Sequence, residues 1–261
     1  MLTYQYIKIL KNLKWTEMEN KDYIRNAFTD AELKNGVWNN WDGRGNILSK
    51  KFIDLISEKI KFDDVKVILD IGSRDGLQSL EFNRWFPNAR VIALEPIKTS
   101  FEFIKNLTKD IPNIESFPYA ANSHNGTTKF YEVYNGNVGA SSLLKTTKHS
   151  RASRWAQKEV EVECVVMSDF LKEININQVD LIWMDVQGAE KIVLESLGEY
   201  LNDVAAIATE CGIVDLYEGS IKKDGLDTIL NEFTCIDEEP VGSNTELNVI
   251  YINKKNEVNI T

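Results

Sequence analysis

Short apolar runs and longer amphipathic segments alternate along this chain from residue 65 onward. The short runs are rich in valine, isoleucine and leucine, which is typical of buried strands. The longer segments place apolar residues three or four positions apart, which is typical of helices packed on a sheet. Strands are therefore expected at residues 65–71, 90–94, 114–119, 181–185, 205–210, 234–238 and 247–252.

Three helices are predicted between these strands, at residues 77–85, at 99–107 and from Gly188 onward. Strands that alternate with helices predict a mostly parallel sheet covered on both faces. The last two strands are separated by a short turn region, so we expect them to form an antiparallel hairpin at one sheet edge. An additional β segment, made of residues 127–134 and 159–166, interrupts the alternation.

The first 60 residues are rich in charged and aromatic residues and look mainly helical. A turn-rich loop at 36–45 carries Trp38 and Trp41. These two rings either pack a helical cap onto the sheet or offer flat faces to the C–H groups of a sugar acceptor. We expect two parts, an N-terminal helical cap over residues 1–60 and a ligand-binding domain over 61–261.

Composition restricts the class of protein. The 261 residues carry a formal net charge of −10, which argues against sequence-independent binding to nucleic acid. No apolar run reaches the roughly 18–20 residues that span a bilayer, and the N-terminus does not read as a signal peptide. The three cysteines lie far apart and form no metal or redox pair. We expect a cytoplasmic protein with buried free thiols, and these features leave its oligomeric state open.

Four acids lie at the carboxyl ends of predicted strands, namely Asp70, Glu95, Asp185 and Glu210. In an open α/β sheet, ligands bind beyond these ends. Four acids at one edge are too many to be explained as random surface charge. The sequence therefore predicts a binding site at this edge.

The loop after the first strand reads Gly72-Ser73-Arg74-Asp75-Gly76. It lacks the Gly-x-Gly-x-x-Gly spacing of dinucleotide sites, and Asp75 would face a phosphate with like charge. A cofactor with an ammonium and a sulfonium group and no phosphate suits this loop better. The loop therefore favours S-adenosylmethionine.

In such a site, Asp70 would orient the loop or hold the amino group of the cofactor. Glu95 would accept hydrogen bonds from the ribose hydroxyls, as an acid about 20 residues after the glycine loop does in nucleotide-binding sheets. Residues 120–122 would line the adenine. Cofactor contacts are expected at Asp70, Gly72, Ser73, Arg74, Gly76, Glu95, Pro96, Ala121, Asn122 and Asp185.

Three motifs carry a family resemblance: Asp70-Ile71-Gly72, Glu95-Pro96 and Met184-Asp185-Val186-Gln187-Gly188-Ala189-Glu190. Over about residues 65–252 the chain resembles the FkbM-type methyltransferases of the class I S-adenosylmethionine-dependent superfamily. The resemblance implies a Rossmann-like sheet of seven strands with helices on both faces. It also implies methyl transfer to a hydroxyl, often on a sugar or a secondary metabolite.

Three positions depart from the family pattern. Arg74 stands where a small residue or Asn is usual, and Trp183 stands where Lys is frequent. Gln187 stands where Glu is usual, which removes one candidate base or metal ligand.

Removal of the acceptor proton calls for a base near the transferring methyl. Asp185 is the first candidate, because its central strand ends there; its alternative role is an acid that stabilises the start of the next helix. Glu210 would complete an acidic pocket with Asp185. Together these two carboxylates could hold Mg²⁺, which would lower the pKa of the hydroxyl.

A basic run at 145–155 stands out in this acidic chain. It is either a solvated loop or a lid over a phosphate-linked acceptor, such as a nucleotide sugar or a lipid-linked glycan. In the second case Arg151 and Arg154 would bind phosphate, and His149 would be an alternative base.

The sequence thus predicts an S-adenosylmethionine-dependent O-methyltransferase that acts on a small-molecule or glycan acceptor. Two alternatives stay open at this point, a nicotinamide-dependent oxidoreductase on a related sheet and a non-catalytic subunit that kept the cofactor pocket. The spacing of the glycine loop counts against the oxidoreductase.

Overall fold

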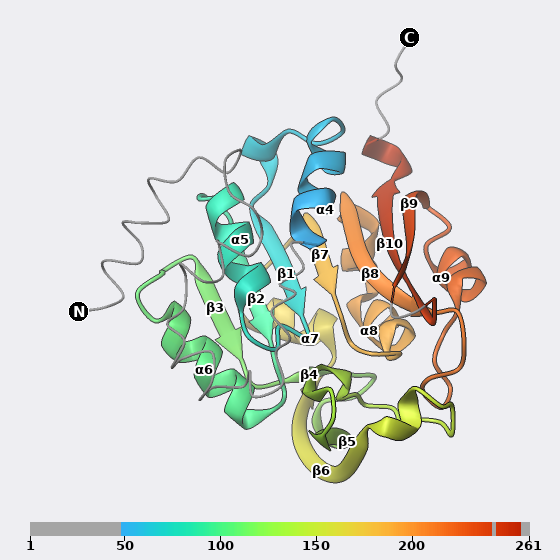
Figure 1. Ribbon diagram of the computed structural model, residues 1–261. Coiled ribbons are helices and arrows are strands. Elements are labelled where there is room, and N and C mark those ends of the chain that lie inside the picture. The colour runs from blue at the N-terminus through green and yellow to red at the C-terminus, as the bar shows by residue number, and fades with distance from the viewer. Residues whose placement is uncertain (1–47, 242–243, 257–261) are drawn as a thin grey trace, which may run out of the picture.

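The computed structural model describes residues 48–241 and 244–256 (Figure 1). Seven strands form one sheet, in which five parallel strands are followed by an antiparallel hairpin at one edge. The predicted sheet is therefore confirmed. Its spatial order is β3 (Ile114–Phe117), β2 (Arg90–Leu94), β1 (Val67–Ile71), β7 (Leu181–Met184), β8 (Ala206–Gly212), β10 (Glu246–Asn253) and β9 (Phe233–Val241).

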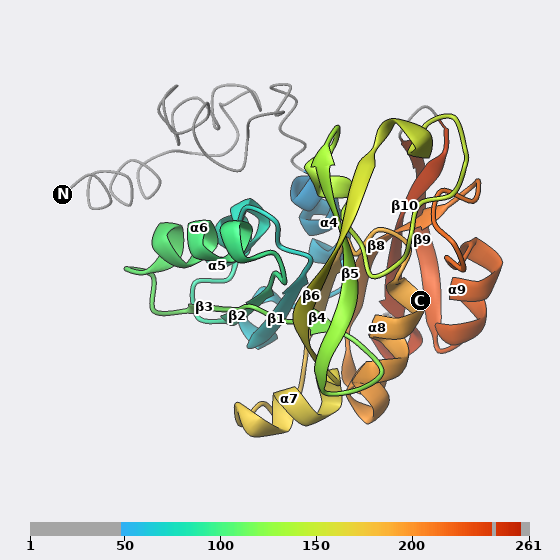
Figure 2. The same cartoon turned by 90° about the horizontal axis from the view of Figure 1, so that it is seen from below.

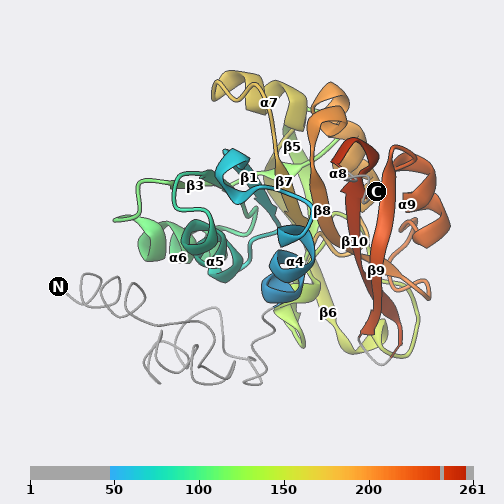
Figure 3. The ribbon, with the colours of Figure 1, turned by 90° about the horizontal axis from the view of Figure 1, so that it is seen from above.

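Helices cover both faces of this sheet, as Figures 2 and 3 show. One face carries α4 (Leu48–Ser57), α5 (Leu77–Trp85) and α6 (Lys98–Thr108). The other carries α7 (Met167–Glu173), α8 (Glu190–Leu197) and α9 (Lys223–Ile229). The helices α7 and α9 are additions to the sequence-based prediction. Short 3-10 turns occur at Phe62–Asp64, Val138–Ala140, Ala152–Arg154, Gly198–Asp203 and Lys254–Asn256.

The central strands are buried on both faces, which explains their near-continuous apolar sequences. On one face, Leu69 and Ile71 of β1 pack into a core with α7, α8 and α9. On the other, Ile68 packs with Phe52 of α4 and Phe82 of α5. Neighbouring residues of β1 thus serve opposite cores, because side chains along a strand alternate between its two faces.

A second, three-stranded sheet contains β4 (Ala120–Ala121), β6 (Ala156–Val165) and β5 (Gly126–Asn135). β5 and β6 are antiparallel, which confirms the predicted additional β segment. In Figure 1 the arrowheads of β1, β3 and β7 point toward the end of the molecule where this small sheet lies. The small sheet therefore stands over the carboxyl ends of the central strands.

Trp38, Trp41 and most of the expected cap over residues 1–60 lie outside the described residues, so both interpretations of the two rings stay predictions. The part of this segment that is described, α4, buries Phe52, Ile53 and Ile56 against the sheet. Across residues 48–241 and 244–256, no helix has the length and apolar character needed to cross a bilayer.

Candidate active site

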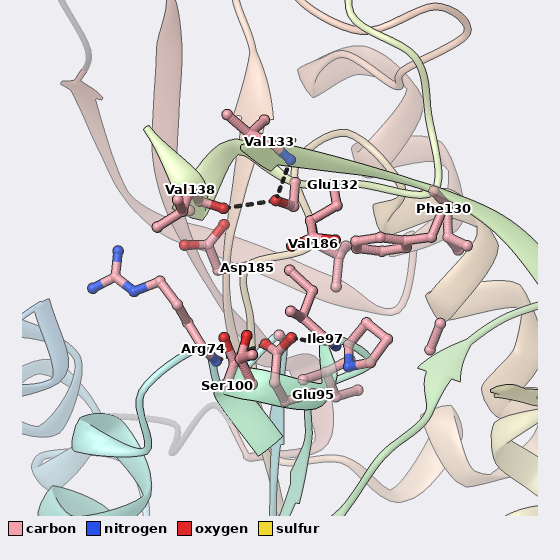
Figure 4. Close-up of a pocket in the computed structure, with 18 of the residues that line it drawn as sticks. Arg74, Glu95, Ile97, Ser100, Phe130, Glu132, Val133, Val138, Asp185 and Val186 are labelled. Carbon is pink, nitrogen blue, oxygen red and sulfur yellow. Dashed lines mark hydrogen bonds between the residues drawn. The ribbon is translucent and has the colours of Figure 1, made fainter. Parts of the chain in front are cut away.

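A cavity of about 610 Å³ opens where β1, β2 and β7 end, and β5 lies across from these ends (Figure 4). Its size falls within the roughly 300–1,000 Å³ typical of sites for small organic ligands. Six of the predicted cofactor contacts line it: Gly72, Arg74, Glu95, Pro96, Ala121 and Asp185. Four others, Asp70, Ser73, Gly76 and Asn122, lie outside its lining.

Asp70 forms hydrogen bonds with the glycine loop and with α5. Its Oδ2 accepts hydrogen bonds from the hydroxyls of Ser73, at 2.7 Å, and Ser79. Burial raises the pKa of Asp70 to about 6. These bonds hold the Asp70 carboxyl group against the glycine loop and α5, and both roles expected for Asp70 stay predictions.

Gly72 begins the loop in a left-handed conformation, with φ 83°. Its N–H and that of Ser73 both donate to the carbonyl of Leu94, at 3.0 and 3.1 Å. These bonds extend the contact between β1 and β2 beyond the strands themselves. Both N–H groups are thereby used within the fold.

Arg74 and Asp75 form an ion pair inside the loop. Arg74 Nε donates to Asp75 Oδ2 at 2.7 Å, and Asp75 Oδ1 accepts the N–H of Leu77 at 3.1 Å, at the start of α5. Asp75 is buried and is not part of the cavity lining. The charge of Asp75 is used by Arg74 and by the helix N-terminus, so Asp75 stabilises the loop and the start of α5.

Glu95 presents its carboxyl group to the cavity while its position is fixed by the backbone. Oε2 accepts the N–H of Arg74 at 2.9 Å, and Oε1 accepts the N–H of Ile97 at 2.8 Å. Burial raises the pKa of Glu95 to about 7, and the two backbone bonds oppose this rise. Each oxygen retains a further lone pair, so ligand hydroxyls still find acceptors here.

Three further predicted contacts differ in their place, since Ala121 lines the cavity whereas Asn122 and Gly76 do not. Ala121 of β4 lines the cavity, as does Phe130 of β5. Asn122, expected beside it, instead forms a local turn in which its Oδ1 accepts the N–H of Ser123 at 2.8 Å. Gly76 approaches Ile104 of α6, where an added Cβ would lie 3.2 Å from a methyl carbon. Gly76 thus serves the packing of α6 rather than the cavity.

Asp185 directly follows β7 and lines the same cavity as Glu95 and Arg74 (Figure 4). Its N–H donates to the carbonyl of Ile71 at 2.9 Å, which ties it to the end of β1. Its Oδ1 accepts a hydrogen bond from Gln187 Nε2 at 2.6 Å. Burial raises the pKa of Asp185, and the Gln187 amide and the Arg74 charge oppose this.

Glu210, the second catalytic candidate, borders a small cavity of about 40 Å³ that Asp185 also lines. Burial raises its pKa well above the usual value, and the charges of Asp185, Glu246 and Glu190 add to this. Within the described ranges, no three His, Cys, Asp or Glu side chains are arranged to hold a metal ion. The expected Mg²⁺ site at Asp185 and Glu210 is therefore not supported.

The basic run contributes no side chain to either cavity. His149 Nδ1 accepts the N–H of Arg151 at 3.3 Å in a local turn, and this candidate base lines neither cavity. Arg151 Nη1 donates to Glu246 Oε2 at 2.6 Å and also binds Thr245. Arg154 is exposed. The two arginines therefore differ in their surroundings, because Arg151 is held in an ion pair with Glu246 and Arg154 faces solvent.

Sequence reasoning missed the opposite wall of the cavity. It comes from β5 and the turn after it, including Glu132, Val133 and Val138 (Figure 4). Ser141 Oγ holds this wall together by bonding the N–H of Val133, at 3.0 Å, and the carbonyl of Val138, at 2.7 Å. The sequence predicts a β segment at 127–134, but such a prediction does not say what the strand faces.

Trp183, one of the departures from the family pattern, belongs to the core. Its ring lies 6.1 Å from that of Phe52 and 5.9 Å from that of Phe82, in tilted and edge-on arrangements. Such pairs contribute roughly 0.5–1.5 kcal/mol each beyond the area they bury. An aromatic residue at this position therefore anchors α4 and α5 to β7.

The family model for the methyltransferase FkbM domain matches residues 70–220. The chain is 29% identical over 184 residues to the 2-O-methyltransferase NoeI of Sinorhizobium fredii, covering 67% of this chain and 75% of that protein. It is 28% identical over 161 residues to Methyltransferase 1 of Beauveria bassiana, covering 57% and 65%. A solved S-adenosylmethionine-dependent methyltransferase from Aquifex aeolicus aligns with a TM-score of 0.44 and 12% identity, covering 90% of this chain and all of that one.

The matched segment spans more than half of the chain and contains the glycine loop, Glu95 and Asp185. These are the parts that build the cavity. The match does not favour the nicotinamide-dependent alternative, and it supports an enzyme over a non-catalytic subunit. The chain belongs to the FkbM methyltransferase family.

Proposed function

We propose that this S-adenosylmethionine-dependent O-methyltransferase acts on a hydroxyl of a sugar or glycan, with Asp185 as the general base. Membership of the FkbM family and the 2-O-methyltransferase among its relatives support O-methylation. The observation that carries the proposal is the place of the Asp185 carboxylate. It lines the cavity beside the glycine loop, at the end of a central strand where ligands of such sheets bind.

The side chains around the cavity fit S-adenosylmethionine. Glu95, fixed by two backbone N–H groups, would bind the ribose hydroxyls with its remaining lone pairs. Arg74, within the loop, lines the cavity and would bind the methionine carboxylate. Ile97 and Ala121 offer an apolar wall for the adenine. When bound, the cofactor supplies a methyl group made electrophilic by the sulfonium.

Asp185 would take the proton of the acceptor hydroxyl while the oxygen forms the new C–O bond and the C–S bond breaks with its electron pair on sulfur. A carboxylate in this role contributes about 100- to 10,000-fold in rate. Orientation of the acceptor in line with the breaking bond supplies much of the rest. Asp185 therefore serves both the proton transfer and the placement of the hydroxyl.

A phosphate on the acceptor, as in a nucleotide sugar or a lipid-linked glycan, would meet the exposed side chains of the basic run. Lys148 and Arg154 are exposed there. Arg151 is a weaker candidate than the sequence suggested, because its guanidinium already binds Glu246.

The test is a labelled-methyl assay over cell-extract glycans and nucleotide sugars, followed by mass spectrometry of the product. On the acceptor so found, Asp185→Asn should lower kcat at least about 100-fold. Its affinity for S-adenosylhomocysteine should stay within threefold of wild type. Asp203→Asn is the matched control, since Asp203 is exposed and pairs with Lys255 away from the cavity. Wild-type turnover by Asp185→Asn would overturn the role of Asp185.

A further inference from the structure

The turn after Asp185 is held in an unusual conformation by a neighbouring loop. Gln187 has φ 55°, in the left-handed region that non-glycine residues seldom occupy. Gly188 follows with φ 96°, and an added Cβ there would lie 3.0 Å from Ser220 Cβ and 3.1 Å from Tyr217 Cβ. The loop between β8 and α9 therefore fixes the shape of this turn.

Gln187 links two groups through opposite ends of its amide. Its Nε2 donates to Asp185 Oδ1 at 2.6 Å, and its Oε1 accepts from the Tyr217 hydroxyl at 2.7 Å. The same hydroxyl lies 3.1 Å from the carbonyl oxygen of Ala140. Tyr217 is buried, so its hydroxyl is sheltered from water.

The chemistry of the three groups selects one orientation of the amide. A carboxylate accepts hydrogen bonds, and the amide N–H is the end of Gln187 that can supply one. A phenol that donates to the amide oxygen leaves the N–H end for Asp185. With the amide reversed, its oxygen would face a carboxylate oxygen and repel it.

We propose that Gln187, held by Tyr217, is a positioning residue that fixes Asp185 as a hydrogen-bond acceptor and leaves its second oxygen for the acceptor hydroxyl. This inference rests on the proposed role of Asp185 as general base. An amide at position 187 supplies a donor to Asp185 without adding a charge. The Glu that is usual at this place in the family would instead add a carboxylate.

The difference between an amide and a carboxylate at position 187 affects the ionisation of Asp185, because other charges already act on this group. Arg74 stabilises its ionised form, whereas Asp75 opposes ionisation, as does burial. Asp185 in turn acts on three further acids, since its charge raises the pKa of Glu190, Glu210 and Glu246, and Arg151 opposes the rise for Glu210 and Glu246. A further carboxylate at position 187 would have to share a proton with Asp185 or repel it.

The experiment follows the side-chain carboxyl carbon of Asp185 by ¹³C NMR as a function of pH, in the full chain with S-adenosylhomocysteine present. The signal is assigned by its loss in Asp185→Asn. The test variants are Gln187→Ala, Gln187→Glu and Tyr217→Phe. Matched controls are Gln178→Glu, whose amide donates to Asp180 at 2.9 Å, and Tyr200→Phe, whose hydroxyl donates to the carbonyl of Ile176 at 2.7 Å.

Gln187→Ala should raise the titration midpoint of Asp185 by about one pH unit, because an N–H donor to the charged form is lost. Gln187→Glu should produce two coupled steps, the upper one about two units above the wild-type midpoint. Tyr217→Phe should shift the midpoint in the same direction by less, because the amide keeps its N–H but loses its anchor. Neither control should move it.

The kinetic counterpart uses the acceptor identified by the labelled-methyl assay. Gln187→Ala and Tyr217→Phe should lower kcat about tenfold and leave KM for S-adenosylmethionine within twofold. Midpoints equal to wild type in both variants would overturn the inference about Gln187. Wild-type turnover by Asp185→Asn would instead overturn the proposed base, so the two failures are distinguishable.

Discussion

Gly72 lies so close to the backbone of Asp185 that a Cβ on Gly72 would overlap the Asp185 carbonyl oxygen. Gly72 follows β1 and Asp185 follows β7, and the two strands are parallel neighbours. The glycine loop and the proposed base are therefore in direct backbone contact.

Gly72→Ala should lower the free energy of unfolding by about 2–4 kcal/mol, since it combines a positive φ with an overlap against backbone. Urea denaturation measures this. Gly219→Ala is the matched control, because Gly219 has φ 78° with open space where a Cβ would lie. Gly219→Ala should lower the free energy of unfolding by about 1 kcal/mol. Equal losses in the two variants would contradict the contact with Asp185.

The pair of Arg151 and Glu246 should contribute to stability. The Arg151 side chain is 29% exposed and that of Glu246 is 10% exposed, so removal of the arginine leaves a nearly buried carboxylate without its cation. Arg151→Ala should therefore lower the free energy of unfolding by about 2 kcal/mol, as measured by urea denaturation. The loss should be smaller when Glu246→Gln is already present. An additive double variant would contradict the coupling.

Arg154→Ala, by contrast, should change the free energy of unfolding by less than about 0.5 kcal/mol, because Arg154 is exposed. If the acceptor carries phosphate, the same variant should raise the KM for that acceptor severalfold. A KM equal to that of wild type for a phosphate-bearing acceptor would remove Arg154 from acceptor recognition.

The fold could be read from the sequence because its signals are local. Buried parallel strands need continuous apolar runs, and the helices between them need an apolar stripe, so both patterns appear within short windows. The helix α9 (KDGLDTI) was not predicted, because it is short and buries a single residue, Leu226, so it has no apolar stripe. Residues at strand ends were found for the same reason, since strand ends are visible in the pattern.

What the side chains at those ends contact could not be read in this way. Asp75 belongs to the glycine loop with Arg74, and Asp70 precedes it by two residues, yet their carboxylates bond the start of α5 and two serines. Gln187 and Tyr217 are 30 residues apart and meet through a loop whose path depends on the whole sheet. Sequence periodicity carries no information on such contacts.

Glu81 should make the protein less stable as pH rises. It is buried in α5, its Oε2 has no hydrogen-bond partner among the described residues, and burial raises its pKa to about 8. In the unfolded chain a Glu ionises near pH 4.5, so the folded state loses relative stability between about pH 4.5 and 8. Glu81→Gln should remove this loss.

Urea denaturation of wild type and Glu81→Gln at several pH values measures the effect. The free energy of unfolding of Glu81→Gln should equal that of wild type near pH 4.5 and exceed it by about 2–3 kcal/mol at pH 7. Glu199→Gln, in the Gly198–Asp203 turn and exposed, is the control and should follow wild type at every pH. A constant difference between Glu81→Gln and wild type would show that ionisation is not the cause.

Glu95 should make cofactor binding depend on pH. Its pKa of about 7 means that the carboxyl group is mostly ionised at pH 8 and mostly neutral at pH 6. The ionised group is the better acceptor for ribose hydroxyls, so calorimetry should show weaker binding of S-adenosylhomocysteine as pH falls from 8 to 6.

Glu95→Gln should bind about 10-fold more weakly than wild type at pH 8, with little dependence on pH. Glu115→Gln, whose carboxylate pairs with Arg90 away from the cavity, should keep the wild-type profile. If Glu95→Gln retains the wild-type pH dependence, another group controls it and Glu95 is not the ribose acceptor.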